Sequence, residues 1–136
     1  MNQIESVAAY VPYMTCVGNH EQKYNFSNYK SRFTMPEASG DGHNLWYSFD
    51  VGPVHVVAFT SEVYYFVEYG FGLIAQQYKW LQQDLEEANK PENRAKRPWI
   101  ISMCHRPLYC SNPDKSHCQN PENMIRVGIP TVHDYG

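Results

Sequence analysis

The stretch from Leu45 to Glu62, LWYSFDVGPVHVVAFTSE, constrains the fold most, because it holds two β-rich runs on either side of a Gly52-Pro53 pair. Glycine and proline together between such runs are typical of a tight turn. The stretch therefore predicts an antiparallel hairpin. His55 interrupts the second strand, and one polar residue there is more typical of a hydrogen-bonded core or edge histidine than of a metal ligand.

An amphipathic helix is predicted after the hairpin. Its apolar residues recur at spacings of four, three, four and three, which is the period of an α-helix. They are Ile74, Tyr78, Leu81, Leu85 and Ala88, and Trp80 lies beside them and extends the stripe. The pattern indicates a helix packed on a sheet.

Two other apolar runs are too short for free-standing helices and are typical of buried strands. They are residues 13–17, within VAAYVPYMTCV, and WIISMC at 99–104. Residues 22–44 and the charged stretch NKPENRAKRP are punctuated by proline or glycine, which predicts irregular loops. The order strand, loop, hairpin, helix, strand predicts an α/β arrangement in layers, where ligand sites gather at the carboxyl ends of strands.

Composition excludes several classes of function. The chain has 136 residues, enough for one domain with a core, and a formal net charge of -3. This balance gives no electrostatic reason to expect nucleic acid or an anionic membrane as a partner. No apolar run approaches the roughly 18 to 20 residues of a membrane span, and the first ten residues lack the pattern of a signal peptide.

The four cysteines are too few and too unevenly placed for a disulfide-dense scaffold. Cys110 and Cys118 could close one loop disulfide. Four free thiols are the alternative, because Cys16 and Cys104 sit in apolar runs where cysteine is commonly a small buried hydrophobe. Asn25 begins NFS, an acceptor triplet for N-glycosylation in a protein of the secretory pathway, and an unmodified surface loop is the alternative.

The tetrapeptide Gly18-Asn19-His20-Glu21 directly follows the first apolar run. The amide oxygen of Asn19 is a neutral, hard ligand suited to a divalent ion, and Gly18 lets the backbone approach that ion closely. His20 would donate a hydrogen bond to a bound phosphate or protonate the leaving group, because histidine changes charge near neutral pH. Glu21 would either hold the His20 ring or remain a surface carboxylate.

His105 is the second candidate ligand, because it follows the WIISMC run much as Asn19 follows the first run. A strand can fix an imidazole within the tolerance that metal coordination requires. Taken alone, a histidine before Arg-Pro is more typical of a structural turn. His43, His117 and His133 lie in irregular sequence, and we expect them to be solvated.

Three blocks together resemble the calcineurin-like metallophosphoesterases, specifically the purple acid phosphatases, and most closely their animal iron/zinc type. The blocks are GNHE at 18–21, the hairpin LWYSFDVGPVHVVAFTSE, and WIISMCHRPLYCSN at 99–112. They occur in the order and approximate spacing of the family. Protein phosphatases of the same superfamily usually have arginine before the tetrapeptide, where this chain has Val17.

This resemblance implies a layered β-sandwich flanked by helices, of which the chain would hold a part. It implies Asn19 and His105 as ligands of a divalent metal, and His20 as the substrate-binding acid or hydrogen-bond donor. The implied cofactor is a dinuclear centre of iron with zinc, manganese or a second iron, which activates a hydroxide to hydrolyse small phosphate monoesters. A secreted or lysosomal location is implied as well.

The aspartates and tyrosine that hold the family's ferric ion, and its Gly-His-x-His block, have no counterpart in the sequence. We therefore expect residues 1–136 to be the central part of a catalytic domain, lacking its N-terminal and C-terminal metal-ligand blocks and inactive alone. Two alternatives stay open. One is a non-catalytic fragment or pseudoenzyme that acts as a binding module, and the other is a phosphodiesterase or protein phosphatase of the same superfamily.

Overall fold

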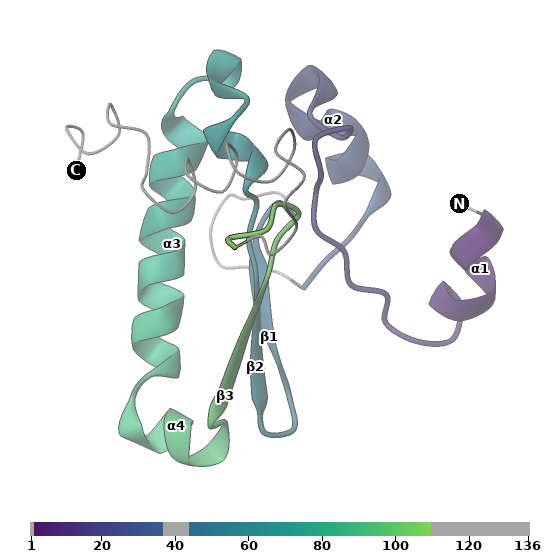
Figure 1. Ribbon diagram of the computed structural model, residues 1–136. Helices are drawn as coiled ribbons and strands as arrows, with labels where there is room; N and C mark the ends of the chain where they lie inside the picture. Colours follow the sequence, from purple (N-terminus) through teal and green to yellow (C-terminus); the bar gives the residue numbers. More distant parts are fainter. Residues whose placement is uncertain (1, 37–43, 110–136) are drawn as a thin grey trace.

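The computed structural model describes residues 2–36 and 44–109 (Figure 1). In chain order the elements are α1 (Asn2–Ala8), α2 (Lys23–Arg32), β1 (Tyr47–Val51), β2 (Val54–Ala58), the 3-10 helices η1 (Glu62–Tyr64) and η2 (Val67–Tyr69), α3 (Gly72–Ala88), α4 (Pro91–Lys96) and β3 (Trp99–Met103). None of the helices in these two ranges has the length and apolar character that crossing a bilayer requires.

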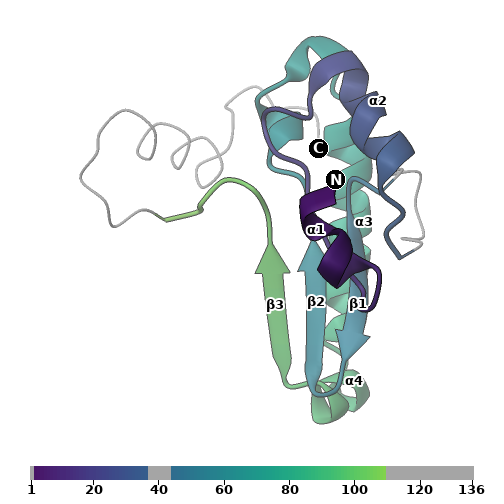
Figure 2. The same ribbon diagram turned by 90° about the vertical axis from the view of Figure 1, so that its right-hand side faces the viewer.

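The strands form a three-stranded sheet in the order β1-β2-β3. β1 and β2 pair antiparallel, from Tyr47 opposite Ala58 to Val51 opposite Val54, which confirms the predicted hairpin. Gly52 has a φ of +53° in its turn, a conformation that glycine adopts without steric cost. β2 and β3 are parallel, with α3 between them in the chain and lying along one face of the sheet (Figure 2). The carboxyl ends of β2 and β3 therefore share one edge.

Helix α3 packs on the main hydrophobic core, as its periodicity predicts. That core consists of Val17, Phe26, Tyr29, Leu45, Trp46, Val57 and Trp80, with Leu81 and Leu85 packed against it. The expectation for Tyr78 is wrong, because its side chain is 65% exposed and Gln77 is buried in its place. The Gln77 amide is satisfied there, since it accepts the Thr60 N–H at 2.8 Å and donates to the Thr60 carbonyl at 3.0 Å.

Residues 13–17 are not a strand, contrary to the prediction. The backbone of Thr15 bonds to side chains in place of a neighbouring strand. Its carbonyl accepts hydrogen bonds from the hydroxyls of Tyr29 and Tyr47 at 2.9 and 2.7 Å, and its N–H lies 3.5 Å from the sulfur of Met35. Burial raises the pKa of both tyrosines, so they stay protonated donors.

Two stretches predicted as loops contain helices. α2 lies within residues 22–44, and its Tyr24, Asn25 and Phe26 have left-handed φ angles of 54°, 54° and 60°. α4 lies within NKPENRAKRP and begins at Pro91, where a proline loses no helical hydrogen bond and has a φ suited to the first turn. In both cases proline or irregular composition concealed a short helix.

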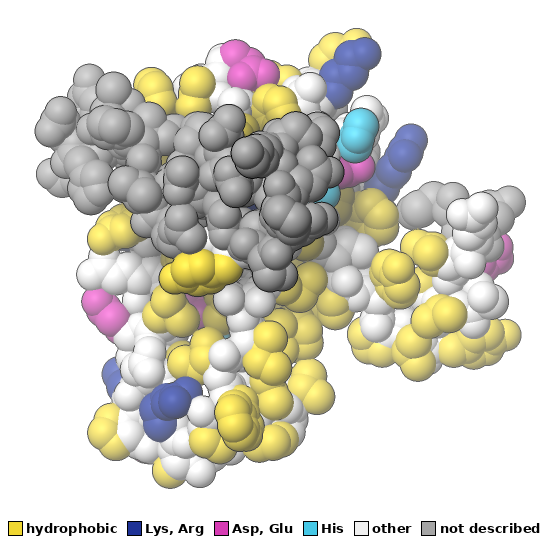
Figure 3. Space-filling model, in the orientation of Figure 1, with side chains coloured by type: hydrophobic (Ala, Val, Ile, Leu, Met, Phe, Trp, Pro, Cys, Tyr) yellow, Lys and Arg dark blue, Asp and Glu magenta, His cyan; other side chains and the backbone are white. Residues whose placement is uncertain are grey.

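The sheet face opposite α3 is partly open. Side chains alternate between the two faces of a strand, and on this face Trp99 is 65% exposed, Ile101 53% and Val51 58%. β3 is therefore a strand as predicted, but not a buried one. Hydrophobic side chains gather at the surface over the lower part of the sheet (Figure 3). Within residues 2–36 and 44–109 the strands form this one sheet, which is one layer of the expected architecture.

Candidate functional site

Two loops that are distant in the sequence meet at the edge where β2 and β3 end. Asn19 lies in the turn after Val17, and His105 lies two residues after the end of β3. The Nε2 atom of His105 and the Oδ1 atom of Asn19 are 3.1 Å apart, although 86 positions separate them. Both side chains are exposed. The structure thus brings together the two residues that the sequence proposes as ligands of one ion.

Gly18 is buried beneath this pair. A Cβ atom at this position would lie 3.0 Å from both Cε1 and Nδ1 of the His105 ring. A side chain at position 18 would therefore push the imidazole away by a few tenths of an ångström. The carboxylate of Glu21 accepts the Gly18 N–H at 2.9 Å, and the Glu21 N–H donates to the Gly18 carbonyl at 3.1 Å. Glu21 closes the turn, a role that the sequence did not suggest for it.

His20 projects from the same turn and is exposed. A cavity of about 290 Å³ lies beside it against α2, lined by His20, Glu21, Asn28, Tyr29, Arg32 and Phe33. The volume is close to the lower end of the range for small-molecule sites. His20 and Arg32 place nitrogen donors on this cavity, which suits an anionic group. The catalytic role of His20 stays a prediction.

The Asn19–His105 pair fits part of a divalent-metal site. Neighbouring ligands that each lie about 2.1 Å from one ion are roughly 3 Å from each other, close to the separation observed here. In the part of the chain that the structure describes, no three His, Cys, Asp or Glu side chains gather closely enough to hold an ion. The described residues thus supply two candidate ligands, not a complete set.

An ion pair that the sequence analysis did not single out lies next to His105. Arg106 donates to the Glu62 carboxylate from Nε at 2.9 Å and from Nη2 at 2.8 Å, and Glu62 is completely buried. The sequence did contain a signal. Glu62 sits within AFTSEVYYF, and a carboxylate in such apolar surroundings is rarely buried without a cation.

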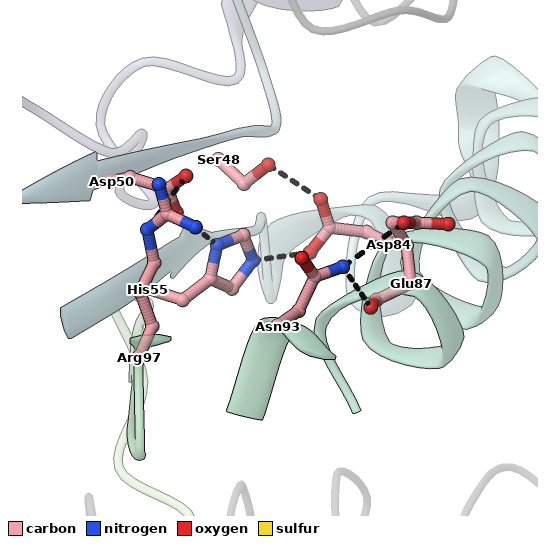
Figure 4. A network of polar contacts seen from close by, with 7 residues as sticks. All are labelled: Ser48, Asp50, His55, Asp84, Glu87, Asn93 and Arg97. Atoms are coloured by element: carbon pink, nitrogen blue, oxygen red, sulfur yellow. Dashed lines mark hydrogen bonds and ion pairs between the residues drawn. The ribbon is translucent and has the colours of Figure 1, made fainter. Parts of the chain in front are cut away.

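The structure confirms His55 as a hydrogen-bonded histidine (Figure 4). Its Nδ1 lies 2.8 Å from Asp50 and its Nε2 lies 2.9 Å from Asp84. Ser48 donates to the other oxygen of Asp84, and Arg97 pairs with the other oxygen of Asp50 at 2.9 Å. Burial alone would lower the pKa of His55, but its bonds to the two aspartates outweigh burial and raise it.

The structure describes some of the remaining residues that the sequence marks as candidates and leaves others undescribed. Cys16 and Cys104 are free and half-buried, and burial raises the pKa of both thiols. Asn25 lies on α2, and its Oδ1 is buried with no hydrogen-bond partner among the described residues. Five candidates lie outside the described residues: His43, Cys110, His117, Cys118 and His133. The disulfide and the glycosylation stay predictions.

Comparison with known proteins identifies the family. The family model for calcineurin-like phosphoesterases matches residues 1–132 of this chain. The chain belongs to that family. The mixed sheet and the helices beside it are thus one part of the calcineurin-like phosphoesterase fold.

Individual relatives are similar over most of this chain. Acid phosphatase type 7 of Danio rerio is 58% identical over 129 residues, which is 94% of this chain and 28% of that protein. The Homo sapiens protein of the same name is 57% identical over 95% of this chain and 28% of its own length. The structure of a purple acid phosphatase from yellow lupin seeds matches 89% of this chain and 23% of that protein, with a TM-score of 0.66 and 25% identity. This calcineurin-like phosphoesterase chain therefore spans little more than a quarter of its curated relatives.

Proposed function

We propose that residues 1–136 are the central part of the catalytic domain of a metal-dependent acid phosphatase that hydrolyses phosphate monoesters. The names of the acid phosphatase relatives and the family match support this activity. One observation carries the proposal to this chain's own residues. The Asn19 oxygen and the His105 nitrogen, from two separate loops, face each other at 3.1 Å.

Each residue of the site has a definite task in this proposal. Asn19 and His105 hold a divalent ion of a dinuclear centre, which supplies an activated water and neutralises phosphate charge. Gly18 leaves the space that the His105 ring occupies. His20, exposed at the same turn, donates a hydrogen bond to a phosphate oxygen and a proton to the departing alkoxide.

The nature of the ions and the location follow from the family resemblance. The proposed centre pairs iron with zinc, manganese or a second iron, and the remaining ligands come from parts of the protein beyond the described residues. The proposed location is the secretory pathway or the lysosome, where the Asn25 acceptor triplet could be glycosylated. A mass shift on glycosidase treatment that disappears in Asn25→Gln tests this last point.

The site is tested in the full-length protein with His105→Ala, Asn19→Ala and His20→Ala. The first two variants are expected to lose most of the divalent metal and nearly all hydrolysis of a chromogenic phosphate monoester. His20→Ala is expected to keep the metal and lose about 10²–10⁴-fold in kcat. Glu87→Gln, which alters an exposed carboxylate paired with Lys90, is the control and should change neither. Full metal content in both ligand variants would contradict the assignment.

The same assay decides between the alternatives. Faster hydrolysis of diesters than of monoesters would indicate a phosphodiesterase. Retention of metal with no hydrolysis of either ester would favour a binding module. We also expect the separate 136-residue chain to be inactive, because Asn19 and His105 alone cannot complete a dinuclear centre.

A further inference from the structure

The carboxylate of Glu62 is the most deeply buried charge among the described residues, and it lies in the loop beside His105. Glu62 is 0% exposed, and the side chain of its partner Arg106 is 20% exposed. The two N–H···O bonds between them are 2.9 and 2.8 Å long. Such a two-point contact fixes the orientation of the guanidinium as well as its distance.

The contact extends to the backbone that carries His105. The N–H of Arg106, the peptide group directly after His105, donates to Oγ of Ser61 at 3.1 Å. The Ser61 hydroxyl in turn donates to the Glu62 carboxylate at 3.0 Å. Three bonds from one short segment thus hold both the main chain and the side chain of the residue next to the candidate ligand.

The segment that makes these bonds is itself anchored. The N–H of Glu62 donates to Oγ1 of Thr60 at 3.1 Å, and both backbone groups of Thr60 bond to the buried amide of Gln77 on α3. The Cζ atom of the Arg106 guanidinium lies 3.8 Å from the ring centroid of Tyr65, within the range of a cation–π contact. The loop after β2 is therefore hydrogen-bonded both to α3 and to the loop after β3.

A buried ion pair contributes little net free energy to the stability of a loop, because both ions must lose their water. The desolvation cost often exceeds the attraction, and apolar side chains of similar volume commonly do as well. What the pair supplies is a fixed direction, which an apolar contact does not. His105 needs such a direction, because Gly18 leaves its ring only a narrow space and its Nε2 must face Asn19.

We propose that Glu62 and Arg106, with Ser61, form a clamp that positions the His105 imidazole toward Asn19. They are positioning residues, because the Arg106 guanidinium and the Glu62 carboxylate bond to each other and not to Asn19 or His105. This inference rests on the proposed function, in which His105 is a metal ligand. It predicts that loss of the clamp weakens divalent-metal binding as well as the fold, because removing one partner of a buried ion pair also destabilises the protein.

The test compares Glu62→Gln, Arg106→Gln and the double variant in the full-length protein. After removal of the divalent ion, Zn²⁺ is titrated back and metal per chain is measured by elemental analysis. We expect each single variant to bind Zn²⁺ about 10 to 100-fold more weakly, the effect usual for partners of metal ligands. The double variant should lose no more than either single variant. Activity should return at high Zn²⁺ with kcat near that of the original protein.

Glu87→Gln is the matched control, because it removes the same charge from an exposed pair with Lys90. Ser61→Ala and Arg106→Lys cover the case in which the glutamine variants do not fold. Ser61→Ala removes only the hydroxyl relay, and Arg106→Lys keeps the charge but not the two-point contact, so both should weaken Zn²⁺ binding to a smaller degree.

Three outcomes distinguish failure of the clamp from failure of the proposed function. Unchanged Zn²⁺ affinity with a lowered melting temperature, in any folded clamp variant, would show a purely structural ion pair and overturn the inference. If His105→Ala and Asn19→Ala also retained Zn²⁺, the metal-site assignment itself would fail. If those two lost Zn²⁺ while the clamp variants did not, only the clamp would be wrong.

Discussion

At position 18 the absence of a side chain lets the His105 ring lie close to the backbone of the turn. The His105 ring occupies the space that a Cβ of residue 18 would need, with atoms 3.0 Å from that point. The Glu21 carboxylate then closes the turn by accepting the Gly18 N–H. Because these contacts are short and come from two sides, the turn and the imidazole fix each other's place. The placement of the His105 ring beside Asn19 thus involves a residue that has no functional group.

His55 gives a pH-dependent contribution to stability. Its two ring nitrogens contact Asp50 on β1 and Asp84 on α3, and the charged groups nearby include Arg97, which pairs with Asp50, and Glu87 on α3. Carboxylates are acceptors, so both contacts are satisfied together when the imidazole carries two protons. The protonated ring therefore joins the hairpin to the helix, and the pKa of His55 is raised in the folded protein.

We expect this contribution to be fully present in acid. A folded pKa above the unfolded value, about 6.5, means that the stabilisation exists below pH 6.5 and is lost as the pH rises through the folded pKa. Urea unfolding at several pH values should show this decline, and His55→Gln should flatten it. An NMR titration of His55 should give a pKa above that of an unfolded peptide. A lower pKa, or an unchanged decline in His55→Gln, would contradict the prediction.

Among the elements, α3 makes two kinds of contact with one buried face, which carries Ile74, Gln77 and Trp80. Trp80 packs in the core beneath the sheet, whereas Gln77 holds the loop that follows β2 through the backbone of Thr60. The helix therefore supports both the hairpin and the segment beside the candidate site. Its neighbour Tyr78 is 65% exposed and takes no part in either contact.

Replacing Gln77 is accordingly expected to be costly. Gln77→Ala leaves a buried N–H and a buried carbonyl of Thr60 without partners, which destabilises by about 1–3 kcal/mol or more. Tyr78→Ala, one position along the same helix, should stay within about 0.5 kcal/mol of the original. Chemical denaturation of both variants measures the difference. If both variants lowered the free energy of unfolding equally, Tyr78 would be packed in the core as its place in the apolar stripe predicts, and the buried role of Gln77 would be wrong.

The elements that the sequence predicted are those with a strong local pattern. The hairpin has a Gly52-Pro53 turn between β-rich runs, and α3 has a repeated apolar stripe, so both appear in the structure. Helix α2 has no such stripe, and left-handed residues from Tyr24 to Phe26 interrupt it. The run at 13–17 looked like a strand, but tertiary bonds from Tyr29 and Tyr47 decide its backbone. Contacts between residues so far apart in the chain produce no periodic pattern in the sequence.

At the scale of the whole molecule, topology assembles the site. β2 and β3 are parallel, so the loops after them emerge at one edge, and the turn at Asn19 reaches the same edge. The sequence marked Asn19 and His105 separately as residues that follow apolar runs. It also suggested their meeting through family resemblance. The apolar surroundings of Glu62 in the sequence indicate that it needs a cation, but they do not indicate which one, because the partner Arg106 lies 44 positions away.

The open sheet face predicts the behaviour of the 136-residue chain when it is produced alone. Trp99, Ile101 and Val51 expose more than half of their surface on one side of the sheet, and contiguous apolar surface of this kind drives association. We expect the isolated chain to self-associate in light-scattering measurements and to bind a hydrophobic dye.

The double variant Trp99→Ser/Ile101→Thr is expected to shift the isolated chain toward the monomer and reduce dye binding. Tyr78→Ser is a matched control, because Tyr78 and Trp99 are both 65% exposed but lie on different elements, one on α3 and the other on the open face. If exposure alone caused association, the two sites would respond alike. The prediction would be wrong if the isolated chain stayed monomeric at every concentration. It would also be wrong if Tyr78→Ser reduced association as much as the double variant, because the open face would then not be the surface that associates.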